Sequence, residues 1–391
     1  MNILFYMPLP EYGGVRTVTE RLAAELQQRG NSVSLLMHKR FYGDERDYPN
    51  GIASYYLPSE ILMDEKNISF YHNLINTLKI DVVVNQDALY DSINLIDTVK
   101  ELGVPVISVL HSNPMRQYKW LFKDIATLRN GSFKEKLKRV ARVILYPREK
   151  RRLYRSIEGH FNRLQAGGSY VCVLSPRYKD IVRQINNKIV EICAISNPNT
   201  YIDTKSVEKE KIILFVGRLD NRSKKIQYLL DIWQSVSQLA QDWKLVIVGE
   251  GRDEAMLKKR AAKLKNVEFC GYQNPTSYYE RASILCMTSI FEGFPMALTE
   301  AMQHGCVPIA FDSFAAVYDI ITPGVDGEIV KSFDKREYVK KLTMLIKCDE
   351  YRSRLATAAK SNVTRYDIGN IIEQWDALLK CVNIKQKNKD K

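Results

Sequence analysis

Short apolar runs of strand length recur along this chain, and segments with helix-like spacing separate them. The first half contains such runs at Ile3–Met7, Val33–Met37, Asp81–Val84, Val104–Leu110, Val171–Leu174 and Ile189–Ala194. The second half contains them at Ile212–Val216, Lys244–Val248, Val267–Cys270, Ile284–Met287, Val307–Ala310 and Glu328–Val330. Apolar runs that alternate with helices are typical of parallel sheets with crossover helices. The order predicts an α/β fold of two doubly wound domains facing a cleft, with ligands at the carboxyl ends of the strands.

The chain of 391 residues is longer than one typical domain. The turn-forming sequence SNPN at Ser196–Asn199, followed by the polar TKSVEKEK, predicts a linker. We therefore expect a first domain over residues 1–198 and a second over residues 199–370. A helical pattern follows the second sheet, so a third segment over residues 371–391 holds a helix and the tail KQKNKDK, which we expect to be disordered.

The stretch Thr288–Ala310 (TSIFEGFPMALTEAMQHGCVPIA) joins one apolar run to the next. Pro295 suits the first position of a helix because its φ is fixed, and Glu300 then lies roughly 7.5 Å further along that helix. Glu292 precedes the helix in a loop. The unpaired N–H groups and the positive dipole end of a helix N-terminus form an anion site. Because carboxylates repel phosphate, both glutamates are better suited to accept hydrogen bonds from sugar hydroxyls on either side of it, which matches a nucleotide-sugar.

The cysteines and the N-terminal sequence indicate the cellular compartment. The cysteines are odd in number, scattered and without C-x-x-C pairs, which is typical of reduced thiols in the cytosol. The N-terminus MNILFYMPLP lacks a basic segment and a small-residue cleavage site, and no apolar run reaches the roughly 18 residues of a spanning helix. We therefore expect a cytoplasmic protein that is neither exported nor membrane-spanning. The net charge of +13 makes a polyanion or an anionic surface a plausible partner.

The Glu-x7-Glu spacing within EGFPMALTE, followed by Ala301, Gly305 and VPIA, resembles the family 4 glycosyltransferases, which are retaining enzymes of the GT-B fold. The spacing by itself also fits an ordinary amphipathic helix with two surface glutamates. The resemblance implies that the first domain binds the acceptor, the second binds the nucleotide-sugar, and the last helix packs back toward the first. It also implies that Glu292 holds hexose hydroxyls and Glu300 the ribose hydroxyls. The phosphate and sugar contacts are implied for the backbone of Gly293, Phe294, Pro295 and Met296.

The segment VGRLDNRSKKIQYLL resembles the family's G-R-L motif, in which an arginine and a later lysine neutralise the donor diphosphate. Gly217 and Arg218 end a strand, and Lys224 keeps the family offset to the leucine pair at 229–230. The two cations would stabilise the charge that grows on the leaving group. The gap is one residue longer than usual and Lys225 replaces a glycine, so the phosphate ligand is Lys224 or Lys225; we favour Lys224. A strand-to-helix loop with solvated cations is the alternative.

Other family positions fall at expected strand ends. Gly13 and Gly14 match the glycine pair whose backbone approaches the diphosphate from the first domain, although a plain tight turn explains them equally well. His111 ends the run VISVLH, where the family has a histidine that faces the sugar. We assign it to hexose binding or acceptor activation, with a structural histidine as the alternative. The loops of Gly249 and Tyr272 are implied to hold the nucleoside.

The resemblance implies hexosyl transfer with retention from a nucleotide-sugar, expected to be a UDP-sugar, to a glycan or lipid-linked acceptor in cell-envelope polysaccharide or lipopolysaccharide synthesis. No carboxylate is obviously placed as a nucleophile, so a front-side mechanism is favoured over double displacement. No D-x-D pair or His/Cys/Asp cluster with ligand spacing is present, so we predict catalysis without a metal or another cofactor. A GT-B nucleotide-sugar epimerase and a non-catalytic polyanion-binding protein are the alternatives. The chain has no recognised nucleic-acid motif, so we expect no nucleic-acid partner.

An insertion over residues 115–165 of the first domain is strongly basic. Residues 116–163 hold fifteen Lys or Arg against four acidic residues, with aromatic and aliphatic side chains between them. Basic helices with an apolar side are typical of membrane-surface elements, where each cation near an anionic leaflet contributes about 1 kcal/mol. We therefore expect residues 115–163 to contact an anionic membrane, which places the protein peripherally on the inner face of the plasma membrane. A solvated insertion is the alternative.

Overall fold

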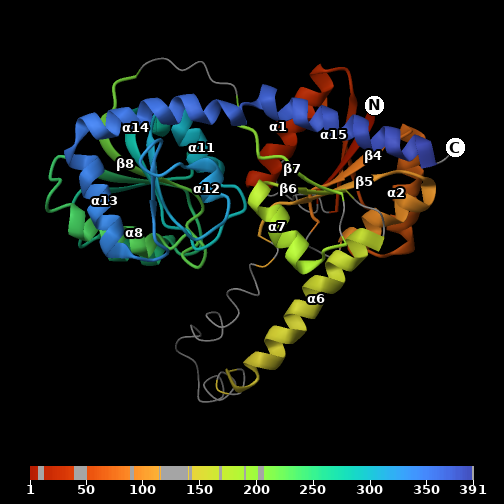
Figure 1. The fold of residues 1–391 in the computed structure, drawn as a ribbon, viewed down its shortest axis with the longest axis horizontal. Coiled ribbons are helices and arrows are strands. Elements are labelled where there is room, and N and C mark those ends of the chain that lie inside the picture. Colours follow the sequence, from red (N-terminus) through yellow and green to blue (C-terminus); the bar gives the residue numbers. More distant parts are fainter. Residues whose placement is uncertain are drawn as a thin grey trace. The chain divides into compact units, whose positions relative to one another are not determined.

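The structure is a computed structural model that describes residues 1–7, 13–38, 51–88, 92–113, 115, 140, 143–166, 170–188, 191–200 and 207–389. The chain divides into two compact units, of which unit 1 comprises Met1–Ile195 with Ile372–Lys391, and unit 2 comprises Ser196–Ile371 (Figure 1). The division precedes Ser196, whereas we expected it after residue 198, so the whole SNPN turn belongs to unit 2. Much of the basic insertion (116–139 and 141–142) lies outside the described residues, as do residues 8–12, 114, 201–206 and 390–391.

The described part of unit 1 is built on a seven-stranded parallel sheet of order β3-β2-β1-β4-β5-β6-β7. Its strands are β1 (Asn2–Met7), β2 (Ser32–Met37), β3 (Ala53–Tyr56), β4 (Val82–Asn85), β5 (Val106–Leu110), β6 (Tyr170–Val173) and β7 (Ile192–Ala194). Its helices are α1 (Gly14–Gln28), α2 (Glu65–Leu78), α3 (Ser92–Ile96), the 3-10 helix η2 (Asp97–Leu102), α6 (Tyr146–Ala166), α7 (Pro176–Ile185) and, from residue 372 on, α15 (Ile368–Lys389). The strand order reverses between β1 and β4, which makes this pair the switch point of unit 1.

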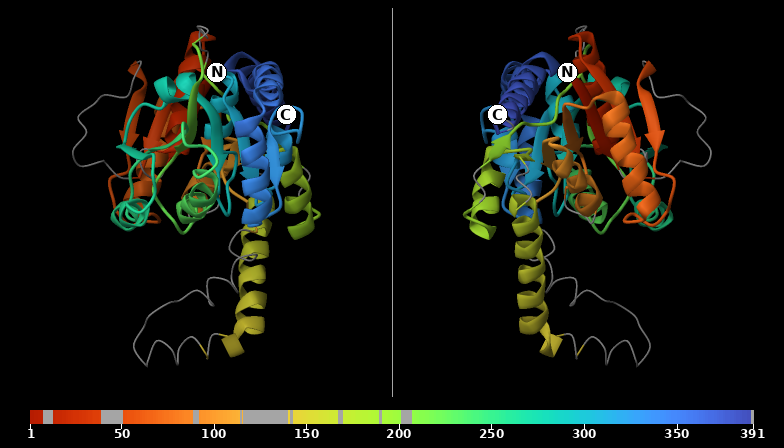
Figure 2. Two further views of the ribbon diagram at one scale, coloured as in Figure 1. Left: turned by 90° about the vertical axis from the view of Figure 1, so that its left-hand side faces the viewer. Right: turned by 90° about the vertical axis from the view of Figure 1, so that its right-hand side faces the viewer.

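The described part of unit 2 has a six-stranded parallel sheet of order β10-β9-β8-β11-β12-β13. Its strands are β8 (Glu210–Val216), β9 (Lys244–Val248), β10 (Val267–Gly271), β11 (Ala282–Met287), β12 (Val307–Phe311) and β13 (Glu328–Val330). Its helices are α8 (Ile226–Val236), α9 (Glu254–Ala261), α10 (Thr276–Arg281), α11 (Met296–Gln303), α12 (Val317–Ile320), α13 (Lys335–Lys347), α14 (Asp349–Asn362) and the 3-10 helix η3 (Val363–Tyr366). Helices lie on both faces of this sheet, with α8 beside α13 and α11 beside α14 (Figures 1 and 2).

Local chemistry sets where several helices begin. Asp64 accepts a hydrogen bond from Lys66 N at the start of α2, and Asp334 accepts from two backbone N–H groups at the start of α13. Ser175 caps α7 in the same way, with Pro176 at the first helical position. These side chains satisfy N–H groups that a helix N-terminus leaves without partners. Of the strands that adjoin these helices, β4, β6 and β13 are buried throughout, whereas the edge strands β3 and β7 are half-buried or exposed.

Each unit has its own apolar core. In unit 1 a cluster forms between the sheet and α2, α3 and η2, and it includes Tyr6, Tyr71 and Ile96. In unit 2 a larger cluster, which includes Trp233, joins the sheet to α8, α9 and α13. Trp233 is 1% exposed and donates from Nε1 to the Lys265 carbonyl at 2.9 Å, so its one polar atom is satisfied within the core.

The two doubly wound parallel sheets confirm the predicted fold class. Every predicted apolar run overlaps a strand of the structure. The strand β3 was not predicted; it is a short edge strand whose residues are exposed or half-buried, although its sequence ASYY is largely apolar. The expectation of a disordered tail was wrong as far as Lys389, because α15 continues through it. Within unit 1, α15 is tied by ion pairs from Asp376 to Arg29 and from Lys385 to Glu191.

Candidate active site

Two loops meet at the switch point of the unit 2 sheet. Strands β8 and β11 are neighbours in the sheet but not in the chain, and the crevice at the carboxyl ends of such a pair is where α/β sheets bind ligands. Lys224 lies in the loop after β8, and Glu292 lies in the loop after β11. Lys224 Nζ is 2.6 Å from Glu292 Oε1, and the two side chains are 21% and 14% exposed. The structure thus brings together two predicted catalytic residues that are far apart in the sequence.

The loop after β8 is folded around Asp220. Its carbonyl accepts hydrogen bonds from Ser223 N at 3.2 Å and Lys224 N at 2.8 Å. Its carboxylate accepts from Arg222 N at 2.9 Å, Ser223 Oγ at 3.1 Å and Arg252 Nη2 at 2.7 Å. Burial opposes ionisation of Asp220, but Arg252 and the loop hydrogen bonds outweigh it and lower the pKa of the carboxyl. Asp220 therefore stays charged and fixes the turn that presents Lys224.

Lys225 occupies the position where the resemblance expects a glycine. It is the N-cap of α8 and has φ of 48°, in the left-handed region that favours glycine. Thr288 Oγ1 donates to the carbonyls of Lys224 at 3.0 Å and Lys225 at 3.3 Å, which ties the two loops together. The Lys224 side chain is the one that meets Glu292, and this geometry supports our preference for Lys224 over Lys225 as the phosphate ligand.

Three glycines lie at the ends of adjacent strands. Gly217, Gly249 and Gly271 follow or end β8, β9 and β10, and Gly249 N donates to the Gly271 carbonyl at 2.7 Å. Gly249 has φ of 136°, and a Cβ added there would lie 2.1 Å from the Gly217 oxygen. The fold itself therefore requires glycine at position 249, because any side chain would collide with the neighbouring backbone. Tyr272, the predicted nucleoside contact, follows β10 and is 64% exposed, and Arg218 is exposed as well.

The loop after β11 leads into α11 through Pro295. Ile290 N donates to the Ser223 carbonyl at 2.8 Å, and Asn197 Nδ2 donates to the Phe294 carbonyl at 3.2 Å. Pro295 is the N-cap of α11, with ψ of 105°, so the helix begins one residue later than we predicted. Pro295 also carries no backbone N–H group. Of the four predicted residues, only Gly293, Phe294 and Met296 can therefore donate a backbone hydrogen bond to a ligand.

Glu300 lies more than one turn along α11, and its carboxylate meets a tyrosine. Tyr279 Oη donates to Glu300 Oε2 at 3.2 Å. Glu292 and Glu300 thus stand on either side of the N-terminus of α11, as the spacing predicts. The dipole of this helix favours an anion at its N-terminus, and neither carboxylate lies on the first turn itself.

The remaining predicted site residues lie in unit 1. Gly13 is the N-cap of α1 and Gly14 is the first residue of that helix; a Cβ added to Gly13 would meet nothing within 4 Å. His111 follows β5, and its Nε2 lies 2.5 Å from Oε1 of Gln86, which follows β4. Burial lowers the pKa of His111 to about 4, so the imidazole is neutral at neutral pH. A neutral imidazole can accept a proton or a hydrogen bond, whereas a protonated imidazole can do neither.

Comparisons with known proteins agree with this geometry. The family description "Glycosyltransferase Family 4" matches residues 12–197, and "Glycosyl transferases group 1" matches residues 199–362. The chain belongs to the family 4 glycosyltransferases. The family covers both units, so the resemblance seen in the Glu-x7-Glu and G-R-L segments extends over nearly the whole chain.

Curated relatives of this glycosyltransferase come from bacteria. It is 34% identical over 198 residues to an uncharacterized glycosyltransferase of Haemophilus influenzae, covering 49% of this chain and 56% of that one. It is 32% identical over 177 residues to the Campylobacter jejuni enzyme named GalNAc-α-(1→4)-GalNAc-α-(1→3)-diNAcBac-PP-undecaprenol α-1,4-N-acetyl-D-galactosaminyltransferase, covering 44% and 49%. It is 33% identical over 181 residues to the amylovoran biosynthesis glycosyltransferase AmsD of Erwinia amylovora, covering 45% and 50%. The chain thus spans about half the length of the curated relatives it matches.

Solved structures show that the glycosyltransferase has the GT-B fold. The apo form of the lipopolysaccharide outer core galactosyltransferase WaaB superposes with a TM-score of 0.70 at 19% identity, over 96% of this chain and 98% of that one. HepE of Anabaena in complex with UDP-glucose superposes with a TM-score of 0.72 at 14% identity, over 97% and 100%. At these identities the likeness concerns the fold alone.

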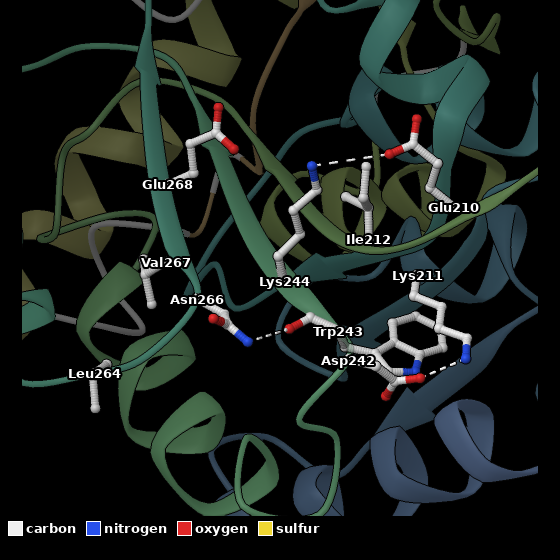
Figure 3. Close-up of a pocket in the computed structure, with 10 residues that line it drawn as sticks. All are labelled: Glu210, Lys211, Ile212, Asp242, Trp243, Lys244, Leu264, Asn266, Val267 and Glu268. Carbon is white, nitrogen blue, oxygen red and sulfur yellow. Dashed lines mark hydrogen bonds and ion pairs between the residues drawn. The ribbon is translucent and has the colours of Figure 1, made fainter.

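A surface hollow of about 480 Å³ lies elsewhere in unit 2 (Figure 3). It is lined by the first residues of β8, β9 and β10, among them Glu210, Lys244 and Val267. Charged side chains at its rim pair with one another, as Lys211 does with Asp242. The hollow is therefore at the amino ends of the strands, opposite the carboxyl ends that carry Lys224 and Glu292, and it is not the predicted donor site.

Three residues near the predicted positions escaped the sequence analysis: Tyr279, Asn197 and Gln86. Each acts on a predicted residue through a hydrogen bond to a distant part of the chain. Asn197 lies in the SNPN stretch, which was interpreted as a turn before a linker, and no sequence pattern indicated Tyr279 or Gln86. Among the residues that the structure describes, no group of three or more His, Cys, Asp or Glu is placed to hold a metal ion. None of the helices in the described ranges is long and apolar enough to cross a membrane.

Proposed function

We propose that the protein is a retaining glycosyltransferase that moves a hexosyl unit from a UDP-sugar to a glycan or lipid-linked acceptor in cell-envelope polysaccharide synthesis. The observation that carries the proposal is the Lys224–Glu292 pair at the unit 2 switch point, with Glu300 further along the helix that starts there. A cation paired with one carboxylate before a helix N-terminus, with a second carboxylate further along that helix, matches a diphosphate flanked by two sugars.

Each group has a role in this proposal. Glu292 accepts hydrogen bonds from hexose hydroxyls and Glu300 from the ribose hydroxyls. Lys224 and Arg218, with the N–H groups of Gly293, Phe294 and Met296, stabilise the diphosphate. The negative charge on the leaving diphosphate grows as the glycosidic bond breaks, so cations fixed before the reaction lower the barrier. The acceptor hydroxyl then attacks on the face that the diphosphate leaves, which retains the anomeric configuration.

Residues of unit 1 complete the proposed roles. Gly13 and Gly14 offer backbone N–H groups at the start of α1, where the N-cap makes no side-chain hydrogen bond. Neutral His111, held by Gln86, binds the hexose or assists the acceptor hydroxyl. The proposal requires no metal, because Lys224 and Arg218 supply the positive charge. The names of the relatives from Campylobacter jejuni and Erwinia amylovora support an envelope glycan as the product, and HepE with UDP-glucose supports the donor class.

The donor assignment is tested by thermal unfolding in EDTA with a panel of UDP-, GDP- and ADP-sugars. A ligand at 100 times its Kd adds about 2.7 kcal/mol of stability, which shifts the Tm by roughly a few degrees or less in a protein of this size. A shift for UDP-sugars that is absent in Glu300→Ala is the expected result. A shift that needs Mn²⁺ would contradict the metal-free proposal, and no shift with any nucleotide-sugar would contradict the donor site.

We also propose that α6 places the enzyme on an anionic membrane surface. The described residues of α6 include more cations than acids. The acids are Glu149 and Glu158, and the cations are Arg148, Lys150, Arg151, Arg152, Arg155 and Arg163. Just before the helix, Val143, Ile144 and Leu145 are 41%, 72% and 41% exposed. Phe161 and Leu164 near its other end are buried in unit 1, and Figures 1 and 2 show the helix projecting outward from there. Exposed apolar side chains beside many cations match the interface of an anionic bilayer.

Co-sedimentation with vesicles at low salt tests this surface. We expect binding to phosphatidylglycerol vesicles and none to phosphatidylcholine vesicles. Reversing Arg151, Arg152 and Arg155 to Glu should reduce binding at least tenfold, since each cation contributes about 1 kcal/mol. The matched control reverses Lys258, Lys259 and Arg260 of α9, which changes the net charge equally but lies in unit 2. Equal losses in both triple variants would show that only total charge matters, and would contradict a dedicated surface.

A further inference from the structure

The carboxylate of Glu300 has a buried partner that the proposed function does not use. Tyr279, on α10, is 2% exposed, and its hydroxyl donates to Glu300 Oε2 at 3.2 Å. A glutamate on a helix surface ordinarily samples several rotamers, and ordering it on binding costs free energy. A hydroxyl fixed beneath the carboxylate reduces that cost before any ligand arrives.

The Tyr279 ring is itself held from two directions. It stacks on His304, with ring centroids 5.9 Å apart and planes 18° apart. His304 is the C-cap of α11, one turn after Glu300, and its backbone N–H donates to the Ala301 carbonyl at 3.1 Å. Lys209 Nζ donates to the Tyr279 carbonyl at 2.8 Å and to the Glu280 carbonyl at 2.7 Å. The phenol is therefore fixed against the same helix that carries Glu300.

The protonation state of His304 bears on this arrangement. Burial lowers the pKa of His304, and the nearby Lys209 and Lys360 lower it further against the opposing effect of Glu280. The stacked imidazole is thus neutral at neutral pH and places no cation beside the Glu300 carboxylate. The Tyr279 hydroxyl supplies the oriented hydrogen bond that this buried side of the carboxylate receives.

We propose that Tyr279 is a positioning residue for donor recognition: its hydroxyl holds the Glu300 carboxylate in the orientation that binds the vicinal hydroxyls of a nucleotide ribose. This rests on the proposed role of Glu300 in donor binding. A hydrogen bond to a charged group contributes more than one between neutral groups, and Glu300 is only half-buried, so its loss is expected to weaken binding by about 3- to 10-fold. The loss should concern ligands that carry the ribose 2′-hydroxyl.

The test compares UDP, GDP and ADP with their 2′-deoxy counterparts by calorimetry on the full chain. Wild type should prefer the ribonucleotide, and Glu300→Gln should lose most of that preference. Tyr279→Phe, which keeps the ring on His304, should weaken ribonucleotide binding by about 3- to 10-fold and change deoxynucleotide binding little. In the double variant the tyrosine change should add nothing to Glu300→Gln, because it acts through that carboxylate. With donor and acceptor in hand, Tyr279→Phe should raise the donor KM and leave kcat nearly unchanged.

The control is Tyr338→Phe, which removes another buried hydroxyl, the one that donates to the Ile309 carbonyl at 2.8 Å. It should lower the Tm as Tyr279→Phe does and leave nucleotide affinity unaltered. A folded Tyr279→Phe that binds ribonucleotides as wild type does, or whose loss adds fully to that of Glu300→Gln, overturns the positioning role alone. If Glu300→Gln itself leaves the ribose preference intact, the proposed role of Glu300 fails and this inference fails with it.

Discussion

The two units place polar groups differently at the carboxyl ends of their sheets. In unit 2 the strands β8, β9 and β11 end on apolar residues, and the charged side chains follow in loops, where Lys224 meets Glu292. In unit 1 the polar side chains stand inside the strands, since Tyr6, Asn85 and Ser108 lie in register across β1, β4 and β5. Tyr6 Oη, Asn85 Nδ2 and Ser108 Oγ are buried and have no hydrogen-bond partner in the part of the chain that is described.

This difference separates polar groups that the fold uses from polar groups that it tolerates. A buried polar atom without a partner costs about 1–3 kcal/mol, so the row across unit 1 reduces the stability of the protein. The unit 2 loops differ in that Lys224 is paired with Glu292 and Thr288 ties the backbone of one loop to the other. Unit 2 also holds buried polar atoms without a partner among the described residues, Ser289 Oγ in the loop after β11 among them, but it has no row of them across the carboxyl ends of its central strands as unit 1 has. Matched substitutions in the two units test this contrast by the size or the sign of their effects.

Glycine substitution should give the largest difference between the units. Gly249→Ala in unit 2 places a Cβ 2.1 Å from the Gly217 oxygen at a φ of 136°. We expect it to lower the free energy of unfolding by more than about 3 kcal/mol, because both the strained φ and the collision must be relieved. In Gly13→Ala the added Cβ meets nothing within 4 Å and the backbone is extended, so stability should hardly change.

Urea unfolding of both variants measures this difference, and donor binding gives it functional meaning. If Gly13 brings its backbone close to the diphosphate, Gly13→Ala should lose activity while it stays folded. A stable, fully active Gly13→Ala would remove Gly13 from the proposed site. A Gly249→Ala protein as stable as wild type would show that the contact between the Gly217 and Gly249 loops can open at little cost.

Lys224→Ala should have the next largest effect, and it acts on turnover. Removing a group that stabilises developing charge costs roughly 100-fold in kcat, which is about 2.7 kcal/mol. The fold should survive, because the ion pair is not in the apolar core. The adjacent Lys225→Ala, at the N-cap of α8, is the matched control and should retain most of the activity. Steady-state kinetics on the two variants show which lysine contacts the phosphate. A greater loss of kcat in Lys225→Ala than in Lys224→Ala would reverse our assignment.

The sequence predicted the fold, and the loops that carry Lys224 and Glu292, for a physical reason. Apolar strands that end in glycine make the strand ends visible, and the residues after Val216 and Met287 can then be assigned to loops at one edge of a sheet. Glu292 and Glu300 were recognised because the Glu-x7-Glu spacing within EGFPMALTE resembles the family's motif, and helix geometry then places Glu300 more than a turn beyond the helix start that Glu292 precedes. The Lys224–Glu292 contact was not predicted, because it depends on β8 and β11 being neighbours in the sheet although they are not consecutive in the chain.

What the sequence did not predict depends on contacts between distant segments. Tyr279 stands beside Tyr278 in the short helix α10, and only the three-dimensional structure shows which of the two meets Glu300. Gln86 was not recognised because its partner His111 lies on the next strand of the sheet. Asn197 was assigned to a turn, although its side chain holds the Phe294 carbonyl. Hydrogen bonds of this kind leave no periodic pattern.

Two buried serines in equivalent settings sharpen the comparison further. Ser108 in β5 of unit 1 is 0% exposed with no partner for its hydroxyl among the described residues, and Ser283 in β11 of unit 2 is 4% exposed. Ser283 Oγ donates to the Glu210 carbonyl at 2.6 Å. Ser283→Ala should therefore destabilise by about 1 kcal/mol, and Ser108→Ala should stabilise by up to about 1 kcal/mol because it removes an uncompensated polar group. Scanning calorimetry gives both signs, and a destabilised Ser108→Ala would mean that this hydroxyl has a partner such as ordered water.

The smallest expected effect concerns two lysines with the same strained backbone, one in each unit. Lys79 ends α2 with φ of 49°, and Lys225 begins α8 with φ of 48°. Glycine relieves the left-handed strain of about 1–2 kcal/mol but increases the entropy of the unfolded chain, so each Lys→Gly change should gain about 0.5–1 kcal/mol. Lys79→Gly should leave donor binding untouched because it is remote from every predicted site residue. A gain at Lys79 with a loss at Lys225 would show that the Lys225 side chain itself stabilises the donor loop, and it would reopen the choice between the two lysines.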